Sequence, residues 1–128
     1  MTINHKQHFK LDNIPAYKES KSLSNEIWDE VTKWDYLAKK TFGEQLIRSI
    51  DSISANIAEG FGRFHKKDKV KFFYNSRASV YESAHWVNLG FERKLISSGL
   101  KDKWMETLRK LPKEINGLIK LTMKNLKQ

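Results

Sequence analysis

The chain has 128 residues, 39% of them hydrophobic, and carries a net charge of +9 from 24 basic and 15 acidic residues. This length suits one domain with a modest core, and the absence of cysteine excludes disulfides and thiolate metal sites. No stretch approaches the roughly 18 consecutive apolar residues of a membrane-spanning helix, and the first residues lack the apolar core of a signal peptide. We therefore expect a cytoplasmic protein without a membrane partner.

The positive charge is concentrated in two segments of the chain. Residues 61–79 and 99–128 are strongly basic, whereas residues 23–60 are net acidic. A clustered positive field attracts polyanions, and nucleic acid is the commonest of these in the cytoplasm. Lysines can also serve only to keep a helical protein soluble. The charge pattern leaves both interpretations open.

The N-terminal segment differs from the rest of the chain. Residues 1–21 are polar, include Pro15 and show no sustained period, which predicts a flexible arm. Residues 22–128 are expected to form the folded domain. From about Ser22, apolar residues recur every three or four positions as far as Leu37, which indicates a first helix. A connection is expected at about 38–42.

The same helical period continues to the C-terminus. It predicts a second helix over about 42–59, ended by Gly60 in a left-handed conformation, and a longer third helix over about 67–96. A fourth helix is expected over about 101–126. Pro112 falls inside this last pattern and should kink or divide the helix near Leu111. Strand patterns are lacking, so we predict an all-α, antiparallel four-helix bundle with a long third helix.

Polar residues border the apolar stripes of the second and third predicted helices. Buried or half-buried arginines need carboxylates or backbone carbonyls as partners. We therefore expect an inter-helix network that fixes how these two helices pack, with contact to a ligand or partner, or a catalytic acid beside an anion-binding arginine, as alternatives. The proposed members are Asn56, Glu59, Arg77, Ser79 and Glu82, with Arg48 placed similarly.

Signatures of catalysis are lacking. The chain has no nucleophile elbow, phosphate-binding loop or dinucleotide-binding glycine pattern, and no histidine pair with the spacing of a zinc enzyme. A weak metal site at His5 and His8 of the arm is the one alternative. We expect no enzyme activity, no cofactor and no metal.

The basic segments are candidates for nucleic-acid contact. Residues 63–71 interleave aromatic rings with cations, and phosphates pair with lysine and arginine while exposed rings stack on unpaired bases. The second and third predicted helices do not suit a helix-turn-helix motif, because the third helix is longer than a recognition helix usually is. The candidate phosphate ligands are Arg63, Lys66, Lys67, Lys69, Lys71, Lys113, Lys120 and Lys124.

Aromatic content also favours self-association. Four tryptophans in a chain of 128 residues exceed what one slim bundle hides easily, and large aromatic rings are favoured in subunit interfaces. They are Trp28, Trp34, Trp86 and Trp104.

Three motifs carry a family resemblance. Residues 45–48 (Gln-Leu-Ile-Arg), residues 51–60 (Asp-Ser-Ile-Ser-Ala-Asn-Ile-Ala-Glu-Gly) and Arg77-Ala-Ser79 followed by Glu82 resemble the bacterial four-helix bundle proteins also called 23S rRNA intervening-sequence or S23-like proteins. Ala78 departs from the glycine that the family usually has. Matching family positions, none with a catalytic role, are Gln45, Arg48, Ser52, Asn56, Glu59, Gly60, Arg77, Ser79 and Glu82.

The resemblance implies a basic homopentamer and adds Gln45 to the structural polar network. It also implies a place within ribosomal RNA gene inserts, or a role as an accessory protein of a retroelement reverse transcriptase. We therefore expect a non-enzymatic, oligomeric protein that binds nucleic acid, most plausibly structured RNA. The alternatives are an adaptor for a reverse transcriptase and a structural oligomer with no nucleic-acid role.

Overall fold

A computed structural model describes residues 10–124, which are predominantly helical and contain no strand within that range. The expected all-α class is confirmed. A short helix α3 (Tyr36–Ala38) and a π-helical turn η1 (Lys39–Gly43) lead directly into the second long helix. The long helices are α2 (Pro15–Val31), α4 (Glu44–Gly62), α5 (Lys66–Glu92) and α6 (Ser98–Lys124).

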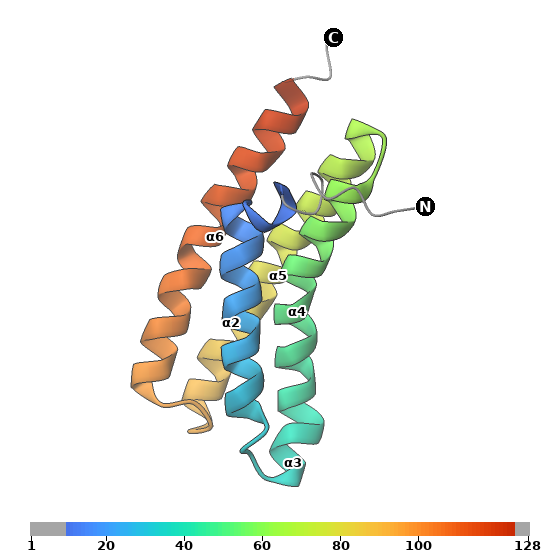
Figure 1. Ribbon diagram of the computed structural model, residues 1–128. Coiled ribbons are helices and arrows are strands. Elements are labelled where there is room, and N and C mark those ends of the chain that lie inside the picture. Colours follow the sequence, from blue (N-terminus) through green and yellow to red (C-terminus); the bar gives the residue numbers. More distant parts are fainter. Residues whose placement is uncertain (1–9, 125–128) are drawn as a thin grey trace.

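The long helices alternate in direction along the chain, as Figure 1 shows. Helix α4 packs against α2 and α5, and α6 packs against α5 and α2, so each long helix has two long neighbours. The link between α4 and α5 and the C-terminal end of α6 therefore lie at one end of the molecule. The α3 turn and the link between α5 and α6 lie at the other end.

The core follows the helical period of the sequence. Leu46, Ile50, Ile53 and Ile57 of α4 are fully buried, as their spacing predicts. On α6 the large ring of Trp104 is fully buried, and its indole N–H donates to Glu26 of α2 at 2.9 Å. A buried tryptophan usually needs such a partner, because an unpaired N–H in the core is costly.

Helices α4 and α5 meet through small side chains. The buried Ser76 hydroxyl donates to the Ile53 carbonyl at 2.7 Å, and Ser83 donates to the Ser49 hydroxyl at 3.2 Å. The tyrosines Tyr74 and Tyr81 continue the apolar period of the sequence on α5, yet both are exposed, so serines take their place on the buried face. Its buried members are Phe73, Ser76, Val80, Ser83, Val87 and Gly90.

The first long helix begins earlier than the sequence predicts. Pro15 occupies the first turn of α2, where a missing N–H costs nothing, so the proline starts the helix instead of marking an arm. Ala16 and Ser20 are buried in this early part. The predicted flexible arm over 1–21 is therefore wrong from residue 15 onward, and residues 1–9 lie outside the described range.

The connection predicted at about 38–42 is helical instead. Asp35 caps α3 by accepting a hydrogen bond from the Ala38 amide at 2.9 Å, and the chain stays helical from Tyr36 to Gly62. The second helix also runs past Gly60, which has no positive φ. Gly60 is instead buried in the helix, where an added Cβ would lie 2.7 Å from the Phe73 ring.

The last helix is continuous. Helix α6 passes through Pro112 without ending, so the proline does not divide it. A kink at that position stays a prediction. Proline cannot donate the usual helical hydrogen bond to the carbonyl four residues earlier, which belongs to Leu108.

Candidate nucleic-acid interface

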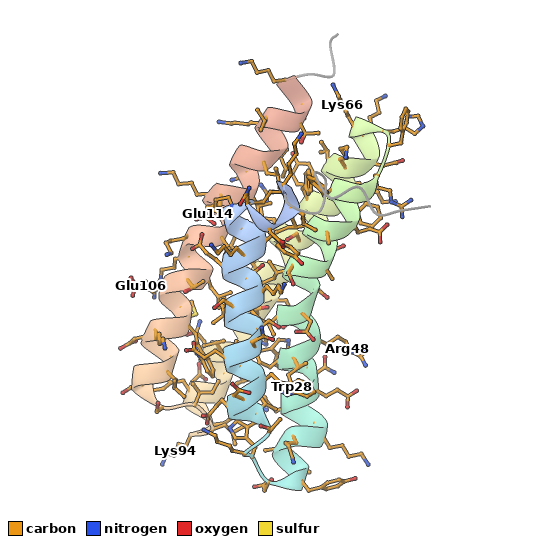
Figure 2. The ribbon with its side chains drawn as sticks, viewed as in Figure 1. Trp28, Arg48, Lys66, Lys94, Glu106 and Glu114 are labelled. Carbon is orange, nitrogen blue, oxygen red and sulfur yellow. The ribbon has the colours of Figure 1, made fainter. Side chains whose placement is uncertain are left out.

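The basic link between α4 and α5 is held in place from both sides. Helix α4 ends at Gly62, Arg63 is extended, and α5 begins at Lys66. The two helices approach closely here because Gly60 has no side chain and the ring of Phe73 lies against it. The first cations of α5 are therefore fixed at one end of the molecule, where Figure 2 shows Lys66.

Lys69 has a structural contact that the sequence does not reveal. Its ammonium group donates to the carbonyls of Phe61 at 2.7 Å and Gly60 at 3.4 Å, both in the last turn of α4. The Gly60 carbonyl also accepts a hydrogen bond from the Arg63 amide at 3.2 Å, and the lysine adds a side-chain cap to this end of the helix. Burial lowers the pKa of this amine from its usual value. Lys69 was predicted as a phosphate ligand, but its donors are directed at the protein.

Arg63 is also engaged. It forms an ion pair with Glu59 at 2.8 Å, and its guanidinium lies 4.7 Å from the centre of the Phe72 ring. The side chains of both partners are about half exposed. The carboxylate offsets much of the charge that the arginine would otherwise present to a phosphate.

The other predicted ligands on α5 and α6 are more accessible. Lys66 is half-buried, whereas the remaining lysines are exposed and form no ion pair with any residue in the 10–124 range. They form a set of uncompensated cations on the surface of these two helices. The members are Lys67, Lys71, Lys113, Lys120 and Lys124.

One groove lies at the basic end of the molecule. It has a volume of about 370 Å³ and brings together the start of α5, the ends of α4 and α6, and the segment before α2. Lys10, Lys66 and Lys69 line it together with apolar side chains. Because Lys69 is already bonded to α4, this groove offers less free charge than its composition indicates.

A second, larger groove runs between α5 and α6, and the sequence reasoning missed it. It has a volume of about 540 Å³ and no carboxylate in its lining. Arg109 and Lys113 of α6 are exposed on one side, and Tyr81 of α5, 63% exposed, lies on the other. The spacing of Arg109, Lys113 and Asn116 along one face of a helix was the signal available in the sequence.

Arg77 lies next to this groove. Its guanidinium donates to the side-chain oxygen of Asn116, which lines the groove, at 2.6 Å. It also lies 5.0 Å from the centre of the Tyr74 ring. Tyr74, Arg77 and Tyr81 recur at helical spacing on α5 and so share one face of that helix, and Tyr81 of these three lines the groove.

The polar network predicted between the second and third helices does not form. Most of its members bond within their own helix, at a spacing of four residues, and Arg77 reaches α6 instead of α4. Gln45 is exposed. The observed pairs are Arg48 with Glu44, Asn56 with the Ser52 carbonyl, Glu59 with Arg63, Ser79 with the Asn75 carbonyl, and Glu82 with the Trp86 indole.

The comparison with protein families decides the identity of the chain at family level. The family model described as 23S rRNA-intervening sequence protein matches residues 12–117. The chain belongs to this family. No curated protein matches the chain. The match to the intervening-sequence family spans α2, α4, α5 and most of α6, including every residue that lines the groove between α5 and α6.

Three structural findings complete the description of the chain. Ala78, where the family usually has glycine, is exposed, so its methyl group lies outside the core of the described residues. Across residues 10–124, no helix has the length and apolar character needed to cross a membrane. Within the same range, no three histidine or carboxylate side chains are grouped as a metal site would need.

Proposed function

We propose that this protein is a non-enzymatic, oligomeric four-helix bundle that binds RNA through the exposed cations of α5 and α6. The observation that carries this proposal is a set of exposed lysines on these two helices that form no ion pair with any residue the structure describes: Lys67, Lys71, Lys113, Lys120 and Lys124. The description of the family, which refers to 23S rRNA, supports RNA as the polyanion.

The distribution of acidic groups is consistent with this surface. Two carboxylates of α2 are used at its contact with α6, where Glu26 pairs with Lys103 at 2.5 Å and Glu19 with Lys110 at 3.3 Å. Helix α6 thus directs two lysines toward α2 and keeps others free. Phosphates bind such free cations without sequence preference, with an affinity that falls steeply as salt rises.

Self-association would multiply a modest surface of this kind. Several copies of a weak phosphate-binding patch on one assembly raise the overall avidity without any new contact. The exposed Trp28 beside an apolar groove on α2 and α4 favours an oligomer.

Binding to a structured rRNA fragment across a salt series tests the proposal. We expect measurable affinity at low salt that decreases linearly on a log–log plot. The double variant Lys67→Glu/Lys71→Glu should weaken binding about tenfold or more, because it removes and reverses two phosphate contacts. The matched control Lys33→Glu/Lys94→Glu alters two exposed lysines at the opposite end and should bind like the unmodified protein.

Two results would contradict the proposal. Affinity that is absent at low salt, or independent of salt, would exclude a phosphate-binding surface. Equal binding by the two double variants would indicate that the charge serves only solubility. In that case the apolar groove around Trp28 favours a protein partner, such as a reverse transcriptase, and a reverse transcriptase gene beside this one would support that alternative.

A further inference from the structure

We propose that the groove between α5 and α6 holds a single unpaired nucleotide of a bound RNA, with Tyr81 stacking on the base and Arg109 and Lys113 contacting the flanking phosphates. This inference rests on the proposed RNA-binding function. It adds a site and a ligand class to that function, because it predicts a preference for RNA with unpaired bases.

The shape and size of the groove fit one nucleotide. Its volume of about 540 Å³ lies within the roughly 300–1,000 Å³ typical of small-ligand sites. Its floor is apolar, formed by Val80, Ala84, Met105 and Leu108, and such a floor suits the flat face of a base. A base in an intact duplex is stacked and paired and cannot enter, whereas bases in loops and bulges are free to do so.

The charge of the groove selects an anion. Arg109 and Lys113 are exposed, and neither forms an ion pair with a residue in the described range. The lining contains no carboxylate, in contrast to the apolar groove that contains Trp28 and Glu44 and to the groove that contains Glu19 and Glu26. A phosphodiester beside the base would thus find two cations on the α6 side of the groove.

The ring of Tyr81 supplies a surface on which the base can stack. An exposed aromatic side chain with no packing function is a suitable platform for a base, and the side chain of Tyr81 is 63% exposed. Next to it along α5, Arg77 is held by its 2.6 Å hydrogen bond to Asn116, which leaves the Asn116 amide N–H groups available as donors. The groove therefore offers stacking, hydrogen bonding and charge within one short stretch of two helices.

Binding measurements with two RNAs of equal length and charge test the site. One is a hairpin with an unpaired loop, and the other is a fully paired duplex. We expect the unmodified protein to prefer the hairpin about tenfold. The Tyr81→Ala variant should bind the hairpin about tenfold more weakly and the duplex almost unchanged, because it removes the ring on which the base stacks. Tyr81→Phe keeps the ring and should retain the preference, as should Tyr36→Ala, which removes another exposed tyrosine.

The two α6 cations are tested through the salt dependence. The Arg109→Gln/Lys113→Gln variant should reduce the slope of log affinity against log salt by about 0.7 for each phosphate that the protein no longer neutralises. The matched variant Lys33→Gln/Lys94→Gln should leave the slope unchanged. Cross-linking with 5-bromouridine in the loop should modify the tryptic peptide of residues 78–93, which contains Tyr81.

The outcomes separate this inference from the function on which it rests. If the unmodified protein binds neither RNA, both proposals fail together. If it binds hairpin and duplex equally and Tyr81→Ala has no effect, RNA binding stands and the nucleotide site is excluded. If free uridine monophosphate binds as tightly as the hairpin, the groove takes free nucleotides and its assignment to a nucleotide of a bound RNA is overturned. A changed oligomer mass in Tyr81→Ala would overturn it too, because the groove would then belong to a subunit interface.

Discussion

Gly60 illustrates how one absent methyl group determines the packing of two helices. An ideal Cβ at this position would lie 2.7 Å from a ring carbon of Phe73 and 3.0 Å from the Lys69 carbonyl. The backbone carbonyl cannot move without disturbing α5, and Lys69 itself caps α4. The same close approach therefore fixes both the packing and the position of the first cations of α5.

The Gly60→Ala variant should be less stable than the unmodified protein by about 1–3 kcal/mol, the usual cost of overpacking a core contact. Urea denaturation followed by circular dichroism measures this difference. Gly62→Ala is the matched control, because an added Cβ there meets nothing within 4 Å. Alanine is favoured over glycine in a helix, so the control should be unchanged or more stable by up to about 1 kcal/mol. Equal stability of the two variants would disprove the close approach.

At the level of helices, the contact between α2 and α6 includes two ion pairs at a regular spacing. Glu19 and Glu26 of α2 are seven residues apart, as are their partners Lys110 and Lys103 on α6. Seven residues correspond to about two turns of helix, so one alignment of the antiparallel helices α2 and α6 brings both ion pairs together. Glu114 joins this contact on α6, where Figure 2 shows it beside α2.

Glu114 makes this contact sensitive to pH. Burial, a hydrogen bond with Glu19 and the like charge of Glu19 raise the pKa of Glu114 to about 7, against a smaller opposing effect of Lys110. Its Oε1 atom is buried and has no hydrogen-bond partner among residues 10–124. Between about pH 4.5 and 7 the unfolded chain releases this proton while the folded protein keeps it, so the group lowers stability as pH rises.

We therefore expect Glu114→Gln to be more stable than the unmodified protein at pH 8, by about 1 kcal/mol after allowance for solvent screening. The two proteins should unfold alike at pH 4, where both side chains are neutral. Thermal unfolding at pH 4, 6 and 8 measures the difference. The control is Glu106→Gln on α6, an exposed carboxylate that Figure 2 shows pointing outward. If the stability difference between Glu114→Gln and the unmodified protein does not grow with pH, the raised pKa of Glu114 is contradicted.

The sequence predicts the long helices well because their cores follow a simple period. Leu46, Ile50, Ile53 and Ile57 are buried as their spacing requires. On α5, however, the period does not show which face is buried, because the buried face contains serines and serine gives no hydrophobic signal. Ser76 and Ser83 are buried because α4 comes close enough to accept or share their hydrogen bonds, which only the tertiary structure reveals.

The candidate site was less predictable, for a different reason. A count of lysines cannot show which amines are already bonded, and Lys69 is bonded to the end of α4. The Glu59–Arg63 pair could have been recognised from its four-residue spacing. The groove between α5 and α6 depends on residues about 30 positions apart, such as Tyr81 and Arg109, whose proximity the sequence does not encode locally.

At the scale of the whole molecule, the proposed self-association requires an exposed apolar surface. Trp28 is 54% exposed and lines an apolar groove of about 440 Å³ with Val31 of α2 and Ile47 of α4. Close to it along the chain, Tyr36 and Leu37 are each 71% exposed. An exposed surface of this kind is typical of a subunit contact, and it lies away from the basic end of the molecule.

We expect Trp28→Lys to weaken self-association about 30-fold or more, because a buried tryptophan at the centre of an interface commonly contributes at least about 2 kcal/mol. Sedimentation velocity over a concentration series should show a shift toward monomer, while circular dichroism stays unchanged. Phe64→Lys is the matched control, since Phe64 is 89% exposed at the opposite end of the molecule and should keep the native mass. If Trp28→Lys keeps that mass as well, the contact lies elsewhere. If the unmodified protein is a monomer at all concentrations, avidity cannot contribute, and each subunit must bind RNA with its own cations alone.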